Sequence, residues 1–313
     1  MLVIDGHCDS LLKVDENNSL YNLGTAAHLD FNRALNNINL QIFAAYIDSS
    51  FKPYHSLQQG LILIERFLQE VEKHDNQVKL VRTLCDLTTL EQKKMLHVLL
   101  AVEGGEILCG KIQLLPLLFR LGVRSIGLTW NQRNEIADGC EEAISKGGLT
   151  SFGIEVVQEM NQLGMVIDLA HIAPAGFWAV LEHTRHPVMV SHGNCHGLCP
   201  HRRNLDDDQI KALAQNNGVM GITFVPEFLG FGDIGIEHVI EHIDYAVSLV
   251  GPDHVGLGSD FDGTETLPRG LEDVAKIPNI KNELLKRGYP LIDVEKIMGG
   301  NFLRLLKSIL NAS

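Results

Sequence analysis

Residues 2–9 read Leu-Val-Ile-Asp-Gly-His-Cys-Asp, a short apolar run that ends in the polar triplet His7-Cys8-Asp9. Short runs rich in Val and Ile are typical of parallel strands that are buried on both faces. The same pattern returns along the chain and predicts eight strands, at 2–5, 40–47, 98–102, 125–128, 165–169, 188–191, 219–224 and 255–258.

Helical patterns lie between these runs. Apolar residues recur every three or four positions over 56–72, 152–163 and 236–249, and acidic residues at 206–208 open a further helix. Strands that alternate with helices predict an α/β protein, and its simplest closure is a (β/α)₈ TIM barrel. We expect one domain over residues 1–313, with 264–313 as a helical C-terminal extension that covers the barrel. An open doubly wound sheet is the alternative, but Gly104-Gly105 lacks the further glycine of a phosphate-binding turn.

The composition of the 313-residue chain limits its partners. It has 26 Lys and Arg against 39 Asp and Glu, a net charge of −13, which disfavours nucleic acid and anionic membranes. We found no signal peptide and no apolar run of 18 residues. The six cysteines form no Cys-x-x-Cys pair, so we expect free thiols in a reducing compartment and a cytoplasmic location.

Chemistry-bearing residues follow the predicted strands. In a barrel these ends meet at one face, where active sites lie. The ends carry His7, Asp9, Glu103, Asp168, His171, His192, Asp260 and Asp262. So many carboxylates in one pocket would repel each other without a cation. Nitrogen and oxygen ligands suit Zn²⁺, Mn²⁺, Fe²⁺ or Co²⁺. An open catalytic site for one zinc ion needs three protein ligands, and the five candidate ligands exceed that number. Two ions that share a carboxylate fit better and suit hydrolysis.

The order and spacing of these motifs resemble the renal (membrane) dipeptidase family of metallopeptidases. The motifs are His-x-Asp at 7–9, Val-Glu-Gly-Gly at 102–105, Asp-Leu-Ala-His at 168–171, Ser-His at 191–192, Arg-Arg-Asn at 202–204 and Gly-Ser-Asp-Phe-Asp-Gly at 258–263. The resemblance implies a binuclear zinc barrel that hydrolyses free dipeptides, L,L and possibly L,D, through a hydroxide that bridges the zinc ions. The chain resembles a cytoplasmic, bacterial-type member of this family. A homodimer is a further expectation.

The resemblance also implies roles for single residues. His7 and Asp9 would hold one zinc, His171 and His192 the other, and Glu103 would bridge the two ions, for which Mn²⁺ or Co²⁺ could substitute. Asp260 would transfer the proton to the departing amine. Arg203 would bind the C-terminal carboxylate of the dipeptide, a role that suits the planar guanidinium, whereas Arg202 is expected to be solvated.

Two positions depart from the family pattern. Trp130 stands where well-known members carry a histidine that contacts the substrate, so it is a candidate substrate-binding residue that cannot take a charge. Glu106 replaces the histidine of Glu-Gly-Gly-His, and we give it no catalytic role. Trp130 keeps open a second hypothesis, a barrel amidohydrolase that acts on another small amide such as an N-acyl amino acid. A third is a catalytically silent metal-binding protein.

Other residues have structural interpretations. Residues 238–242 match the His-x-x-Glu-His zinc pattern, but we expect these histidines on the solvated face of a helix. Cys8 should face away from the metals, Asp168 could orient a ligand, and Asp262 could cap a loop.

Overall fold

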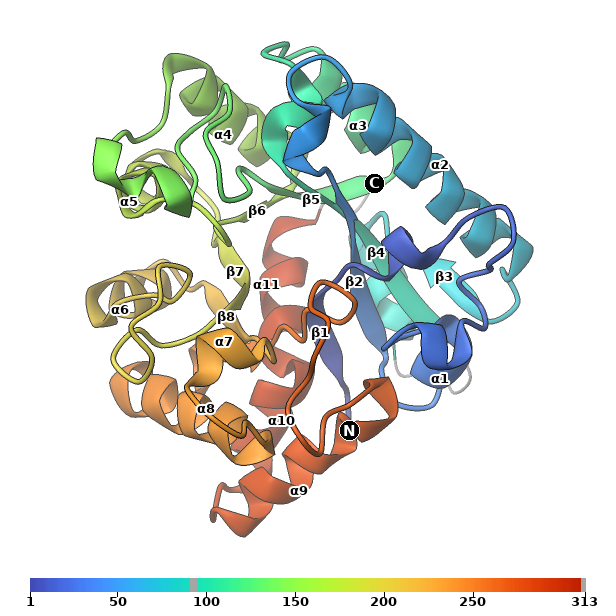
Figure 1. The fold of residues 1–313 in the computed structure, drawn as a ribbon, viewed down its shortest axis with the longest axis vertical. Helices are drawn as coiled ribbons and strands as arrows, with labels where there is room; N and C mark the ends of the chain where they lie inside the picture. Colours follow the sequence, from blue (N-terminus) through green and yellow to red (C-terminus); the bar gives the residue numbers. More distant parts are fainter. Residues whose placement is uncertain (91–94, 311–313) are drawn as a thin grey trace.

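The computed structural model describes residues 1–90 and 95–310 and shows a closed barrel of parallel strands surrounded by helices (Figure 1). All eight predicted strands are present, which confirms the (β/α)₈ TIM barrel. The barrel strands are β1 (Ile4–Cys8), β2 (Leu40–Tyr46), β4 (Leu96–Glu103), β5 (Val123–Gly127), β6 (Val166–Asp168), β7 (Met189–Gly193), β8 (Val219–Ile222) and β9 (Val255–Leu257). Each pairs in parallel with its neighbours, and β9 pairs with β1 to close the ring.

A ninth strand was not predicted from the sequence. β3 (Val78–Leu80) pairs with the first residues of β4, beside the part of β4 that pairs with β5. A strand of three residues is too short to show a periodic pattern, so it could not be predicted from the sequence.

Helices cover the outside of the barrel (Figure 1). They are α1 (Phe31–Ala34), α2 (Ser56–Lys73), α3 (Leu114–Leu121), α4 (Ser151–Leu163), α5 (Pro174–His183), α6 (Asp207–Gln215), α7 (Pro226–Leu229), α8 (Ile236–Val250), α9 (Pro278–Lys286), α10 (Leu291–Glu295) and α11 (Asn301–Ile309). Local chemistry fixes the ends of several of them. The side chain of Asp206 accepts a hydrogen bond from the Gln209 N–H and begins α6, and Gly164 takes the left-handed conformation that ends α4.

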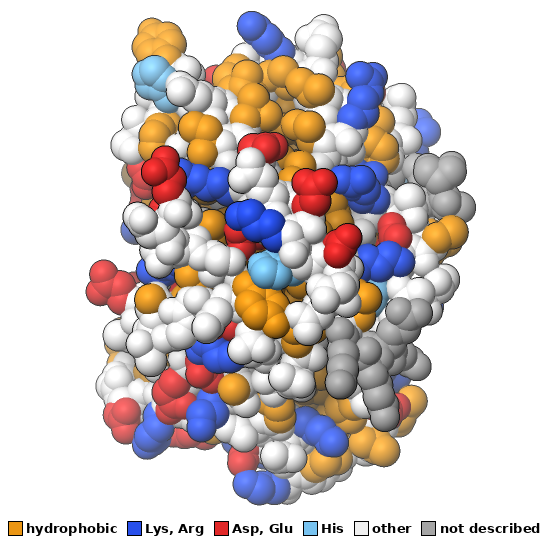
Figure 2. Space-filling view, turned by 90° about the vertical axis from the view of Figure 1, so that its right-hand side faces the viewer, with side chains coloured by type: hydrophobic (Ala, Val, Ile, Leu, Met, Phe, Trp, Pro, Cys, Tyr) orange, Lys and Arg blue, Asp and Glu red, His pale blue; other side chains and the backbone are white. Residues whose placement is uncertain are grey.

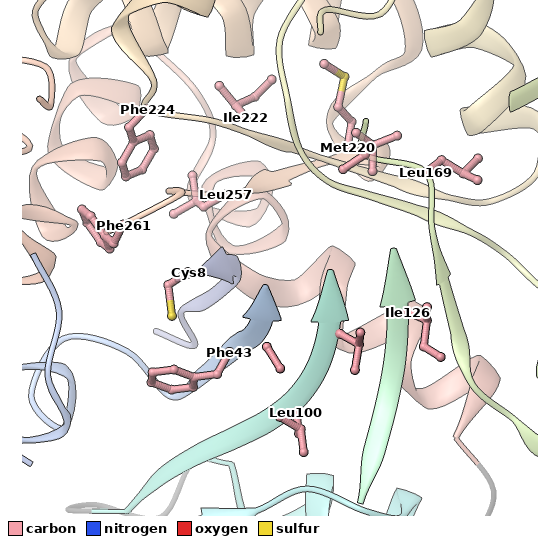
Figure 3. Packing of buried hydrophobic residues seen from close by; sticks show 14 of the residues in the cluster. Cys8, Phe43, Leu100, Ile126, Leu169, Met220, Ile222, Phe224, Leu257 and Phe261 are labelled. Atoms are coloured by element: carbon pink, nitrogen blue, oxygen red, sulfur yellow. The ribbon is translucent and has the colours of Figure 1, made fainter. Parts of the chain in front are cut away.

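Strand side chains that point away from the barrel axis pack against the helices and form the larger hydrophobic core (Figure 3). Cys8 belongs to this core and is fully buried. Its neighbour His7 lies instead among the candidate metal ligands, where the pairing of β1 with β2 becomes irregular between Asp5 and Cys8. Cys8 therefore faces away from the candidate site, as predicted.

The N-terminal end of the barrel is closed by α11. Phe302 is fully buried and forms a second core with apolar residues of the strands, among them Ile4, Leu99 and Val219. A Cβ atom at Gly6 or Gly256 would lie 2.8 or 2.6 Å from the Phe302 ring, so only glycine leaves room for it. The opposite end of the barrel stays open for the site.

The predicted C-terminal extension is only partly helical. After β9, the first helical turn is the 3₁₀ segment Val274–Lys276, and α9, α10 and α11 follow. Residues 264–273 contain Pro268 and Gly270, which disfavour a helix, and Arg269 pairs with Gly235 instead. The predicted start of a helical extension at residue 264 was therefore wrong. Residues 311–313 of the extension lie outside the described part of the chain.

On the face shown in Figure 2, acidic and basic side chains are interspersed with hydrophobic ones. Within residues 1–90 and 95–310, no helix is both long and apolar enough to cross a membrane. The cytoplasmic location and the homodimer remain predictions.

The closure of the barrel by α11 gives a stability prediction. Phe302→Ala should lower the free energy of unfolding by about 3–5 kcal/mol, because it leaves a large cavity between α11 and the strands. Lys307→Ala, at an exposed position of the same helix, is the matched control. Chemical denaturation would measure both; a loss below about 1 kcal/mol for Phe302→Ala would contradict this view of the packing.

Candidate metal centre and active site

The five predicted metal ligands come together at the C-terminal end of the barrel. His7 lies on β1 and His192 on β7, Glu103 ends β4, and Asp9 and His171 follow β1 and β6. All five side chains belong to buried residues that are at most 8% exposed. The parallel strands bring these residues, which are far apart in the sequence, to one buried point.

Glu103 stands between two groups of ligand atoms. Its Oε2 lies 3.3 Å from His7 Nε2, and His7 Nε2 lies 3.4 Å from Asp9 Oδ2. Its other oxygen, Oε1, lies 2.8 Å from His171 Nε2 and 3.7 Å from His192 Nε2. Each carboxylate oxygen thus faces its own group, as a bridging ligand requires.

The atoms of this cluster fit divalent cations. His7 Nε2 and Asp9 Oδ1 are buried and have no hydrogen-bond partner, which is costly unless another positive group binds them. Ligand atoms of His7, Asp9 and Glu103 lie within 4.8 Å of each other, as do those of Glu103, His171 and His192. Two ligands of a tetrahedral zinc ion lie about 3.3 Å apart. These residues have the donor types and spacing for two ions.

Asp260 adds a third carboxyl group to the cluster, beside Asp9 and Glu103. Its Oδ1 lies 3.9 Å from His7 Nε2, and it forms a further possible ligand group with His7 and His192. Burial raises the pKa of Asp260 to about 8; His7 opposes this shift, while the charges of Asp9 and Glu103 add to it. Without cations, the pocket therefore does not favour a full set of ionised carboxylates.

The same surroundings shift the pKa values of His7 and His171. Burial by itself would lower the pKa of His7, but the carboxylates of Glu103 and Asp9 raise it well above its usual value. Burial lowers the pKa of His171 to about 4, and nearby Arg203 contributes to this shift. His171 is therefore neutral at pH 7, the state in which an imidazole binds a metal.

Two turns at the site use an uncommon backbone conformation. His171 has φ 66° and Asp260 has φ 62°, in the left-handed region that non-glycine residues rarely occupy. Such conformations concentrate at functional sites. Here they turn the chain just after β6 and β9, so that both side chains face the cluster.

A cavity of about 490 Å³ opens over the cluster. Its wall includes Trp130, whose ring centroid lies 5.3 Å from that of Tyr46 and 6.0 Å from that of His171. The residues at 263–266, which follow β9, also line it. The volume suits a small molecule, and both Trp130 and Asp260 face it.

Arg203 also lines the cavity, although it is only 5% exposed. Its Nη2 donates to the carbonyl of His192 at 3.1 Å, but its Nε has no partner. Among the described residues, no carboxylate pairs with it within 4 Å, and burial lowers its pKa. Arg202, by contrast, has a side chain 57% exposed and pairs with Glu141, as its predicted solvated position requires.

Glu106 lies outside both ligand groups. It is 3% exposed, its Oε1 lies 2.9 Å from Lys52 Nζ, and its Oε2 accepts from Asn134 Nδ2 at 3.0 Å. It joins loops that follow three different strands. That Glu106 has no catalytic role stays a prediction.

The structure corrects one expectation and explains another. His242, expected in solvent, is 1% exposed: its Nδ1 accepts from the Cys195 N–H, and its Nε2 lies 3.1 Å from the Leu229 carbonyl. It is a buried link between loops rather than a zinc ligand. Asp262 accepts from Ser10 Oγ and the His28 N–H, so it fixes a loop.

Sequence reasoning missed Asn131. Its Oδ1 lies 2.7 Å from His171 Nδ1, the ring nitrogen opposite the cluster. The only signal was its place directly after Trp130, in the loop that follows β5.

The described geometry can be compared with known proteins. Residues 1–313 match the family described as membrane dipeptidase, peptidase family M19. The chain belongs to the membrane dipeptidase family. It is 42% identical to dipeptidase aclJ of Aspergillus oryzae over 215 residues, 67% of this chain and 51% of that protein, so the match spans about half of that relative's length.

Two solved structures of metallopeptidases have the same fold. The dipeptidase AC, a metallopeptidase of family M19, is 27% identical with a TM-score of 0.92, over 100% of this chain and 99% of that one. A metallopeptidase from Rhodobacter sphaeroides, liganded with a phosphinate mimic of L-Ala-D-Ala, is 25% identical with a TM-score of 0.92, over 99% of both chains.

Substitutions at Glu103 and Glu106 test which residues of this membrane dipeptidase family member bind zinc. Glu103→Gln should lower zinc affinity at both ligand groups, because it removes the charge that they share. Glu106→Gln, an equally buried control, should retain both ions. Zinc analysis after gel filtration measures this. Equal zinc content in Glu103→Gln and the wild type would disprove the bridging position.

Proposed function

We propose that the protein is a metal-dependent dipeptidase that hydrolyses the peptide bond of free dipeptides. The observation that carries this proposal is the juxtaposition, in one small cavity, of a ligand cluster for two cations and the buried guanidinium of Arg203, which has no carboxylate partner among the described residues. Family membership supports the same activity.

His7, Asp9 and Glu103 would hold one ion, and Glu103, His171 and His192 the other. The nitrogen and oxygen donors suit zinc, with Mn²⁺ or Co²⁺ as substitutes. When bound, such a pair of ions supplies an activated water molecule at neutral pH and polarises the carbonyl of the substrate.

Arg203 would bind the C-terminal carboxylate of the dipeptide. Its planar guanidinium can donate two parallel hydrogen bonds to a carboxylate. A longer peptide continues as a chain at this position and offers no carboxylate there. The buried Arg203 would therefore select for dipeptides.

Asp260 would carry the proton to the departing amine. It is buried, lines the cavity and lies beside His7. Its backbone N–H donates to the His7 carbonyl at 3.2 Å, which holds the turn in place. A carboxyl group positioned in this way can accept a proton from water and donate it to a leaving group.

Trp130 would pack against the substrate and favours a second candidate function. An N-acyl amino acid also has a free carboxylate for Arg203 and a flat amide that an indole can contact. Assays with L,L-dipeptides, L,D-dipeptides and N-acyl amino acids separate the two functions. The proposal predicts higher kcat/KM for dipeptides, including L,D pairs such as the one mimicked in the Rhodobacter sphaeroides structure. Turnover of N-acyl amino acids alone would contradict it.

The carboxylate contact can be tested at Arg203. Arg203→Ala should raise KM for free dipeptides about 10- to 100-fold, because charge-assisted hydrogen bonds are lost. Arg202→Ala, at the exposed neighbouring position, should leave KM within about twofold. Steady-state kinetics measures both, and an unchanged KM for Arg203→Ala would remove this role.

The proton-transfer role can be tested at Asp260. Asp260→Asn keeps the size of the side chain but cannot carry a proton, so kcat should fall about 10²- to 10⁴-fold. Zinc content should be retained, which separates this role from metal binding. Normal turnover in Asp260→Asn would refute the assignment.

A further inference from the structure

The second ligand group consists of Glu103, His171 and His192. Both of its histidines contact a polar side chain through the ring nitrogen that faces away from the cluster. The Nε2 atoms of His171 and His192 lie 2.8 Å apart beside Glu103. On the far side of each ring, His171 Nδ1 lies 2.7 Å from Asn131 Oδ1, and His192 Nδ1 lies 2.9 Å from Ser191 Oγ. Each ring therefore has one nitrogen towards the cluster and one towards a polar side chain.

The position of one proton decides whether such a ring can bind a cation. A neutral imidazole carries a hydrogen on one nitrogen and a lone pair on the other. Nε2 can be a metal ligand only when Nδ1 carries the hydrogen, so Nδ1 needs an acceptor behind it.

The surroundings of Asn131 favour its oxygen as that acceptor. Asn131 Oδ1 lies 3.2 Å from the Sγ atom of Cys140, which can donate its S–H. With the amide reversed, its NH₂ group would face both the thiol and Nδ1, and the ring hydrogen would move to Nε2. Cys140 is 4% exposed, so water does not readily replace this contact.

Ser191 is oriented by Asp168. Asp168 Oδ1 accepts from the N–H groups of Ala170 at 3.0 Å and Ser191 at 2.9 Å, and so fixes the backbone of Ser191. In this position the Ser191 hydroxyl lies 2.9 Å from His192 Nδ1, and its lone pairs can accept the Nδ1–H of His192.

We propose that Asn131 and Ser191, oriented by Cys140 and Asp168, are positioning residues that hold His171 and His192 as Nδ1–H tautomers and so set the affinity of the second metal position. This inference rests on the proposed function, because it presupposes that Glu103, His171 and His192 hold a cation. The first position, with His7 and Asp9, has neither contact and should not depend on them.

Four variants test the proposal, with zinc affinity measured by chelator competition in the absence of substrate. Asn131→Leu keeps the shape but removes the acceptor, and Ser191→Ala removes the hydroxyl. Each should weaken one of the two zinc sites about 10- to 100-fold and leave the other unchanged. Asn131→Asp retains an acceptor and should retain both sites. Gln132→Ala, on the same loop, is a control with wild-type affinity.

Ser125→Ala is the matched control for Ser191→Ala. Ser125 is equally buried on β5 and donates only to the Val166 carbonyl, so both zinc sites should be unchanged. Wild-type affinity at both sites in Asn131→Leu and Ser191→Ala would overturn the proposal. No zinc binding by the wild type would instead refute the proposed function, and the inference with it.

A second measurement does not depend on how well a variant folds. The ¹⁵N chemical shifts of the histidine rings in the zinc-loaded wild type show which ring nitrogen binds the metal and which carries the hydrogen. His171 and His192 should both show a protonated Nδ1 and a metal-bound Nε2. Metal binding through Nδ1 in either ring would contradict the proposed role of the residue that contacts that nitrogen.

Discussion

The structure depends on one electrostatic constraint, the burial of Glu103 between His7 and His171. Its oxygens lie 3.3 and 2.8 Å from the two imidazole nitrogens, with Asp9 and Asp260 close by. Burial of several carboxylates is unfavourable unless positive charge compensates for it. The neighbouring histidines lower the pKa of Glu103 well below its usual value in spite of its burial. Two divalent cations would supply the remaining charge.

The barrel fold holds these buried side chains in position. Each ligand lies on, or just after, a strand that is buried in the barrel, so the positions of the ligands are set before any ion binds. The N-terminal end is sealed by Phe302 and its helix, while the C-terminal end carries the cavity. Stability and chemistry are thus separated between the two ends of one barrel.

The strands and the candidate ligands could be predicted from the sequence because both follow local rules. A short apolar run ending in His, Asp or Glu is visible in the sequence, and parallel topology brings these ends together. The contacts behind the ligands could not be predicted in the same way. Asn131 meets His171 from a loop 40 residues away in the sequence, and no local pattern encodes that contact.

Two expectations from the sequence were wrong: the solvated position of His242 and the helical character of residues 264–273. His242 follows the polar pattern of α8, but loops from other units cover it and give it buried partners. Residues 264–273 were assigned to a helical extension, although Pro268 and Gly270 oppose a helix and Arg269 pairs with Gly235. For His242 long-range contacts outweighed the local pattern, whereas over 264–273 the local sequence itself opposes a helix.

The central claim is that the buried cluster exists to hold two cations that share Glu103. Anomalous diffraction at the zinc absorption edge, from crystals grown with zinc, tests this most directly. We predict two peaks, one on each side of the Glu103 carboxylate, with His7 and Asp9 at one and His171 and His192 at the other. A single peak, or peaks only at the protein surface, would contradict the account.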